Sequence, residues 1–447
     1  MGQPRLVFVL LVALISAAGT AAVKCPRVAL SRPQWLQPIA RKDIGNIFFG
    51  HSLGMSGEHM AVGAYGLQDY RGAVYMYKLE GTRWGLQQTL KPTDRKPSDH
   101  YGLNLDMSNR TVVIGRPFHN IQGTKSGSAD VWVFNGRHWR RTQQLVPPGN
   151  GWGHGGAWYG YGVAAEGPFA CIGARYQNKI VNGVMTYPRA GAVYVYYRNN
   201  GVGTPYRLVQ TLTGPDEVSF FGDEIQLSGF EDRGGEKRLL VGASRHSPKA
   251  KGAAYLYTRQ GRKWKLSQVL SPTDRYPEYT SQHYGEGIAM SNETILIGGE
   301  TAPSDKGRRT GEVYAYKKVG DKWVQSGPLN PPEGVTRWGL HGQRLGTDQR
   351  FSAVGQWGTV VKGVNRAGSF SYYLRCADGS WRSSKMRVMT DPQSHDSLGK
   401  NVLVKNGFMV VTAPMRDSGT NGDIQNRGLV MVYKYTLGGG PWVEYPD

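Results

Sequence analysis

The sequence predicts an all-β protein, a seven-bladed β-propeller, on three observations. A phrase in which a large apolar or aromatic residue precedes glycine recurs at intervals of roughly 60 residues, ending at Gly50, Gly102, Gly160, Gly222, Gly285, Gly339 and Gly399. Every interval contains the same four strand-like phrases. Turn residues interrupt the chain about every 8 to 12 positions, which leaves no room for long helices.

The four phrases follow a fixed order within each unit. In the first unit they are HSLGMS at 51–56, MAVGA at 60–64, GAVYMY at 72–77 and RWGLQQTL at 83–90. Four strands repeated seven times are typical of sheets that pack face to face around a central channel. The inner strands are expected to start near residues 49, 101, 159, 221, 284, 338 and 398.

Two similar segments, LKPTDRKPSDHYG at 90–102 and LSPTDRYPEYTSQHYG at 270–285, are interpreted as links between blades. Each would connect the outer strand of one blade to the inner strand of the next. Proline restricts φ, and the Asp of each link is expected to hydrogen-bond to its own local backbone, so that the chain crosses tightly.

The two ends of the chain are expected to meet. Residues 1–22 have the layout of a secretory signal, with Arg5, an apolar run and then small residues, so residues 23–447 are predicted to form one propeller. PQWLQPIARKDIGNIFFG at 33–50 resembles an outer-strand phrase that leads into a first blade. PWVEY at 441–445 competes for the same position, and pairing of the N- and C-terminal segments would close the ring.

Other features fit an exported protein. No apolar run after the signal approaches the length of a membrane span. Asn109 and Asn292 begin two glycosylation triplets, so a secreted, extracellular glycoprotein is predicted, most simply a monomer. Cys25, Cys171 and Cys376 allow at most one intrachain disulfide, and Cys171 lies in an apolar run typical of a buried thiol.

The charge is one-sided, with 54 Lys and Arg against 33 Asp and Glu, a formal net charge of +21. Such a field attracts polyanions and raises their encounter rate. For an exported protein these are acidic glycans and anionic surfaces more than nucleic acid. The alternative is that the charge serves solubility alone.

The repeating unit resembles the FG-GAP repeat, the unit of the integrin α-subunit propeller, because it has in order a phrase of the form FG, a strand, VGA, GAVYVY and a strand that begins with Trp. The resemblance extends from about residue 34 to residue 445. It implies a seven-bladed ring. It does not specify the function, because propellers of this family serve adhesion, glycan binding and catalysis. Many such repeats carry a calcium loop of the form Asp-x-Asp-x-Asp-Gly. The turns SGEH and SNRT stand at that place here, so no calcium or other cofactor is expected.

The resemblance also implies that partners bind where the second-to-third-strand loops meet the blade links. These loops are basic, and cations with aromatic rings suit an anionic glycan or a cell-surface or matrix partner. The predicted ligand-binding residues are Arg116, Arg175, Lys179, Arg189, Arg245, Lys249, Lys251, Lys306, Arg308, Arg309, Lys362, Arg366 and Trp357. Alternatively, the loops are basic only because the whole chain is.

Catalysis is the other function considered. A propeller lyase or hydrolase acting on acidic polysaccharide would need a His or Tyr base and a cation beside the substrate carboxylate. His100 and His283 precede Tyr-Gly pairs, but the packing of the tyrosines explains that repetition. The sequence therefore assigns no catalytic residue.

Overall fold

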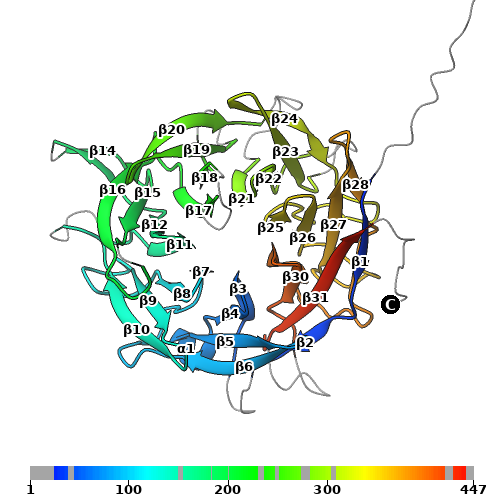
Figure 1. Cartoon of the computed structure of the whole chain (residues 1–447), viewed down its shortest axis with the longest axis horizontal. Helices are drawn as coiled ribbons and strands as arrows, with labels where there is room; N and C mark the ends of the chain where they lie inside the picture. Colours follow the sequence, from blue (N-terminus) through cyan, green and yellow to red (C-terminus); the bar gives the residue numbers. More distant parts are fainter. Residues whose placement is uncertain are drawn as a thin grey trace, which may run out of the picture.

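The computed structural model describes residues 25–38, 45–149, 155–182, 184–199, 201–229, 236–246, 251–272, 282–303, 309–417 and 426–438. Seven antiparallel sheets stand in a ring around a central axis (Figure 1), which confirms the predicted fold class. Within the described ranges, helix is limited to the four-residue turn α1 (Leu67–Tyr70). These ranges contain no helix long and apolar enough to cross a membrane.

Six of the blades are four-stranded sheets of consecutive segments, numbered here in chain order. Blade 1 comprises β3 (Phe49–Ser56), β4 (His59–Ala64), β5 (Ala73–Glu80) and β6 (Arg83–Leu90). Blade 2 comprises β7 (Leu105–Ser108), β8 (Thr111–Arg116), β9 (Ser128–Phe134) and β10 (Trp139–Leu145). Blade 3 comprises β11 (Tyr159–Glu166), β12 (Phe169–Ala174), β15 (Ala192–Tyr197) and β16 (Arg207–Thr213). A hairpin of β13 (Lys179–Val181) and β14 (Val184–Tyr187) projects from blade 3 beyond the ring (Figure 1).

The second half of the ring repeats this order. Blade 4 comprises β17 (Phe221–Ser228), β18 (Arg238–Ala243), β19 (Ala253–Gln260) and β20 (Lys263–Leu270). Blade 5 comprises β21 (Tyr284–Met290), β22 (Ile295–Gly299), β23 (Glu312–Val319) and β24 (Lys322–Leu329). Blade 6 comprises β25 (Leu345–Asp348), β26 (Phe351–Gln356), β27 (Ser369–Arg375) and β28 (Trp381–Ser383). Blade 7 contains β29 (Val402–Lys405), β30 (Phe408–Ala413) and β31 (Leu429–Gly438).

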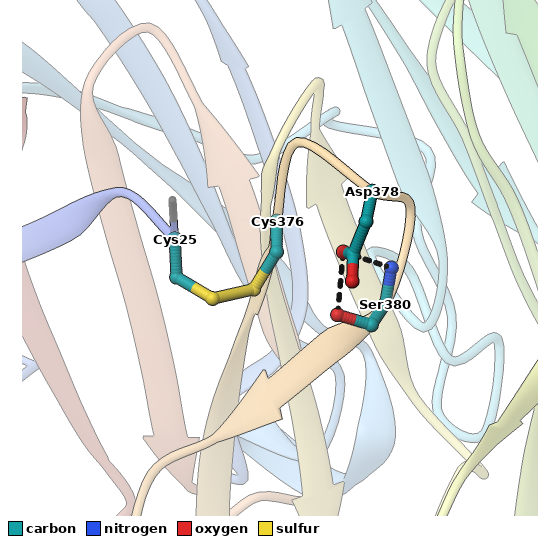
Figure 2. Close-up of a disulfide and its surroundings, with 4 residues drawn as sticks. All are labelled: Cys25, Cys376, Asp378 and Ser380. Atoms are coloured by element: carbon teal, nitrogen blue, oxygen red, sulfur yellow. Dashed lines mark hydrogen bonds between the residues drawn. A yellow bond between two sulfur atoms is a disulfide. The ribbon is translucent and has the colours of Figure 1, made fainter. Parts of the chain in front are cut away.

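The outer side of blade 7 is formed by the N-terminal segment. Both β1 (Arg27–Leu30) and β2 (Gln34–Leu36) pair antiparallel with β31. The competing phrase at 441–445 lies outside the described residues. Just before β1, Cys25 forms a disulfide with Cys376, which lies in the turn between β27 and β28 of blade 6 (Figure 2). Cys171 is a buried free thiol, as its apolar context predicted.

The repeated glycines allow neighbouring blades to approach closely around the axis. A Cβ added to Gly115, in the second strand of blade 2, would lie 2.0 Å from the carbonyl oxygen of Gly160 in blade 3. The equivalent contact between blades 5 and 6 joins Gly298 to Gly342, at 1.9 Å. The ring glycine of the sixth unit is therefore Gly342 in Leu-His-Gly, not Gly339. Its inner strand begins at 345, seven residues beyond the position expected from the sequence.

The hydrophobic core lies between the blades. Ring-phrase aromatics such as Phe49, Tyr101 and Tyr284 are fully buried. Each joint adds side chains from both facing sheets, for example Met76 of blade 1 with Ile114 of blade 2. Stability therefore comes from burying apolar area at seven similar joints rather than at one centre.

A glutamine clamp fastens the outer strands of adjacent blades. The Gln88 side chain in blade 1 accepts a hydrogen bond from the Trp139 backbone N–H (2.8 Å) and donates one to the Trp139 carbonyl (3.0 Å) in blade 2. The same pair of bonds joins Gln34 to Trp84, Gln143 to Tyr206, Gln210 to Trp264, and Gln268 to Trp323. Because Gln34 belongs to β2, the N-terminal strand serves blade 7 as the fourth strand serves the others.

The blade link after β6 crosses tightly for a reason different from the one predicted. Asp94 does not cap its own backbone but accepts from Arg116 (3.4 Å) and Arg141 (3.1 Å) of blade 2. Arg95 donates back to the carbonyl of Gly72 in blade 1 (2.7 Å). The Asp-Arg pair thus ties the link to both blades. Most of the second copy lies outside the described residues.

Replacing Gln88 with alanine should lower the free energy of unfolding by about 2 kcal/mol, because two buried backbone groups of Trp139 lose their partners. Lys385 holds the same position in blade 6 and is exposed, so Lys385→Ala is the matched control. Denaturant unfolding of both variants measures the difference. Equal stability of Gln88→Ala and Lys385→Ala would contradict the clamp.

Reducing the disulfide should destabilise the fold by about 2–4 kcal/mol, since a bridge between residues 351 apart removes much freedom from the unfolded chain. Thermal unfolding with and without dithiothreitol tests this for the natural chain. The Cys376→Ser variant should already unfold at the lower temperature and show no further effect of the reductant. A reductant effect of the same size in both proteins would exclude the bridge as its source.

Candidate functional site at the channel mouth

The site lies where the blade links and the second-to-third-strand loops meet, which we call the loop face. In every unit the residue two positions before the ring glycine has a left-handed backbone, with φ between 53° and 58°. These residues are Phe48, His100, Trp158, Phe220, His283, Leu340 and Ser397. Such φ values are uncommon for non-glycine residues and persist only where the surrounding structure enforces them.

Each left-handed residue begins a tight turn. Its carbonyl accepts a hydrogen bond from the backbone N–H three residues later, at 3.0–3.3 Å in all seven units. The donors are His51, Leu103, Tyr161, Asp223, Glu286, Gln343 and Lys400, which we call the channel-mouth ring. Six of them directly follow a ring glycine that the sequence pattern identifies, so their position could have been predicted from the repeat.

Behind this ring the inner strands enclose a channel cavity of about 290 Å³. All seven inner strands contribute to its wall. Among the polar lining residues nearest the mouth are Asn104, Glu224, Arg344 and Asn401. The cavity can therefore hold a small polar group.

Aromatic side chains of blades 1 to 4 form a continuous arc on the loop face. His100 contacts Phe118 (4.5 Å between ring centroids), Phe118 contacts Trp158 (4.6 Å), and Trp158 contacts Tyr176 (4.5 Å). The complete aromatic arc comprises Phe48, Tyr65, Tyr70, His100, Phe118, Trp158, Tyr161, Tyr176 and Phe220. Most of these rings are half-buried, so the arc offers aromatic surface to a ligand.

Three of the predicted arginines lie on this arc. The guanidinium of Arg175 lies 4.4 Å from the Tyr161 centroid and 3.2 Å from a carboxylate oxygen of Asp223. Arg245 lies 5.0 Å from the Phe220 centroid, and Arg189 lies 5.6 Å from that of Tyr176. Arg189 and Arg245 are exposed, whereas Arg175 is largely buried and serves to hold the rings together.

The other predicted residues have different surroundings. Arg116 is fully buried and binds Asp99 at 2.6 Å, so it is a structural cation of the first joint and not a surface ligand. Lys362 and Arg366 are exposed, while Lys179, Lys251 and Arg309 are half-buried. Lys249, Lys306 and Arg308 lie outside the described residues.

Trp357 belongs to a polar network in the channel-mouth ring. Its indole N–H and the Lys400 ammonium (3.0 Å) both donate to the side-chain oxygen of Gln343. Gln343 in turn donates to Glu286 at 3.0 Å, and Lys400 lies 3.9 Å from the Trp357 ring centroid. Trp357 is thereby fixed in place and partly covered by a cation.

One carboxyl group beside this network, and the lysine within it, have pKa values shifted toward neutral pH. Burial raises the pKa of Glu224 to about 7, although Arg344 lies 2.7 Å away and opposes the shift. Burial and the neighbouring Arg344 charge lower the pKa of Lys400 to about 8. The mouth therefore contains groups that change charge near neutral pH.

The two predicted glycosylation sites lie in first-to-second-strand turns, at the end of the ring opposite the loop face. Asn109 is exposed between β7 and β8. Asn292 is half-buried against the channel, and its side chain accepts a hydrogen bond from Arg238 of blade 4 at 3.2 Å. A glycan would be accommodated without rearrangement at Asn109 alone of these two.

Seven antiparallel sheets around a channel, six of four strands and one of five, define a β-propeller. The family model described as FG-GAP repeat matches residues 84–132, from the outer strand of blade 1 into the third strand of blade 2, and together with the seven blades this match supports an FG-GAP propeller. No curated protein matches the chain significantly. Among solved structures, the crystal structure of Saccharomyces cerevisiae Sqt1 is similar with a TM-score of 0.46 and 9% identity, over 92% of this chain and 99% of that one.

Stability should fall as the pH rises from about 4.5 to 7, in part through Glu224. Its folded-state pKa is raised to about 7, so the folded chain binds the proton more tightly than the unfolded chain, and that advantage is lost as the carboxyl ionises. Melting temperatures across this range should decline less steeply for Glu224→Gln. An identical pH slope in the variant would contradict the assignment.

Proposed function

We propose that this is a secreted, non-catalytic binding propeller that recognises an anionic glycan of a cell surface or matrix through its loop face. The aromatic arc with Arg189 and Arg245 at its edge is the observation that carries the proposal. Aromatic faces pack on the apolar faces of sugar rings, and guanidinium groups bind carboxylates and sulfates with two parallel hydrogen bonds. A face that carries both aromatic rings and guanidinium groups is expected to bind an acidic sugar more tightly than a face that carries only one of the two.

The overall charge supports the same partner. A net charge of +21 attracts a polyanion from a distance, while the arc selects at contact. Exposed Lys362 and Arg366, in blade 6, extend the positive loops past the arc, so a long chain can touch more than one blade. Avidity along one polymer would then raise a modest affinity per sugar.

Secretion is part of the proposal and has two supports. Residues 1–22 carry the layout of a signal peptide. The Cys25–Cys376 disulfide is compatible with an oxidising compartment, where such bridges persist.

Binding of the protein to immobilised heparin, polygalacturonate and dextran, at low and high salt, tests the function. We expect affinity for the two acidic polymers, steep loss with salt, and no binding to neutral dextran. The double variant Arg189→Ala, Arg245→Ala should bind heparin about tenfold more weakly at low salt. Trp158→Ala should weaken binding in a way that salt does not remove, because it deletes ring surface.

The matched control removes the same charge elsewhere. Arg110 and Arg137 are exposed in turns at the opposite end of the strands, so Arg110→Ala, Arg137→Ala lowers the net charge equally. If the two double variants lose the same affinity, the charge acts through solubility and general attraction, and the loop-face site is wrong.

An enzyme acting on acidic polysaccharide is the second candidate, favoured by one observation. Glu224 and Glu300, both beside the channel mouth, have pKa values raised by burial to about 7, which suits proton transfer at neutral pH. A lyase would shorten polygalacturonate and create an unsaturated chromophore, and a hydrolase would shorten it without one. Unchanged polymer length after prolonged incubation would leave binding as the function.

A further inference from the structure

Three possible metal ligands converge at the loop-face end of blade 5. His283 is the left-handed residue of that blade, Glu286 belongs to the channel-mouth ring, and Glu300 follows β22. One ligand atom from each lies within 4.8 Å of the others. The His283 Nδ1 atom lies 2.9 Å from Glu300 Oε1 and 3.6 Å from Glu286 Oε2.

A second observation separates this cluster from an ordinary ion pair. Glu300 is only 7% exposed, and its Oε2 atom is buried without a hydrogen-bond partner. A carboxylate oxygen of Glu286 lies within 4.8 Å of one of Glu300. Two facing carboxylates repel unless a proton or a cation lies between them, so the unpaired oxygen marks the place of a missing positive charge.

We propose that His283, Glu286 and Glu300 bind one divalent transition-metal ion, of which Zn²⁺ and Mn²⁺ are the best examples. An imidazole nitrogen with two carboxylates is a donor set for these ions, whereas Ca²⁺ and Mg²⁺ prefer oxygen ligands throughout. The Gln343 side chain, which donates to Glu286, would orient that carboxylate as outer partners commonly do.

The inferred site does not depend on glycan binding. Three protein ligands leave at least one coordination position for water or for an oxygen of a ligand.

Isothermal titration of the metal-stripped, tag-free protein with ZnCl₂ and MnCl₂ tests the proposal. One site per chain is expected for at least one of these ions, together with a higher melting temperature at saturation. Glu300→Gln, which keeps the shape and removes the charge, should weaken binding about 100-fold or more, and Gln343→Ala by about 10- to 100-fold. CaCl₂ and MgCl₂ should not compete.

His100→Ala is the matched control, because His100 holds the same position in blade 2 but packs against Tyr70 and Phe118 instead of carboxylates. It should bind metal as the natural chain does, whereas His283→Ala should not. Absence of stoichiometric binding by a well-folded natural chain would overturn the proposal, with Glu286 and Glu300 sharing a proton instead. Equal loss in His100→Ala would overturn it too.

Discussion

The structure depends on how closely the second strand of one blade approaches the inner end of the next blade. At six of the seven joints a glycine α-carbon packs against a carbonyl of the next blade, and an added Cβ would lie about 2 Å from that oxygen, as at Gly115 and Gly298. No side chain larger than hydrogen fits at that distance. At the joint between blades 7 and 1 the equivalent residue is Thr412, which packs against Gly50. These contacts bring neighbouring blades close together beside the seven tight turns of the channel-mouth ring.

The outer edge is fastened by hydrogen bonds instead of close packing. Five of the seven joints carry a glutamine clamp; at the clamp position blade 5 has Gly327 and blade 6 has Lys385, neither of which can make both bonds. The disulfide from Cys376 of blade 6 to Cys25 spans one of these two joints (Figure 2). A covalent link thus stands where the recurring polar contact is missing.

Much of the fold could be predicted because this steric constraint appears in the sequence as glycines at recurring positions. The glycines of these close contacts recur in six of the seven blades, and the alternation of β-branched and aromatic residues indicates the strands. The sixth unit was misplaced because two aromatic-or-apolar phrases, ending at Gly339 and Gly342, lie three residues apart, and only the contact with Gly298 distinguishes them. The N-terminal strand was predicted from its outer-strand phrase, whereas the cysteine pairing required the geometry.

The site was harder to predict, because charge in a sequence does not report burial. From the sequence alone, Arg116 cannot be distinguished from the other cations of the basic loops, yet it binds Asp99 inside the joint between blades 1 and 2. The aromatic arc and the His283–Glu300 cluster join residues from different phrases of the repeat, and in the arc from different blades. Their proximity follows from the ring and not from local spacing. Once the ring is known, the position after each ring glycine gives the channel mouth directly.

Hydrogen–deuterium exchange with and without heparin is the most direct test of the central claim that the loop face is the binding surface. The account predicts slower exchange in the segments around Tyr70, His100, Tyr176 and Phe220, and no change in the first-to-second-strand turns at the opposite end, such as that at Asn109. Protection confined to those opposite turns, or spread evenly over exposed basic segments, would contradict it.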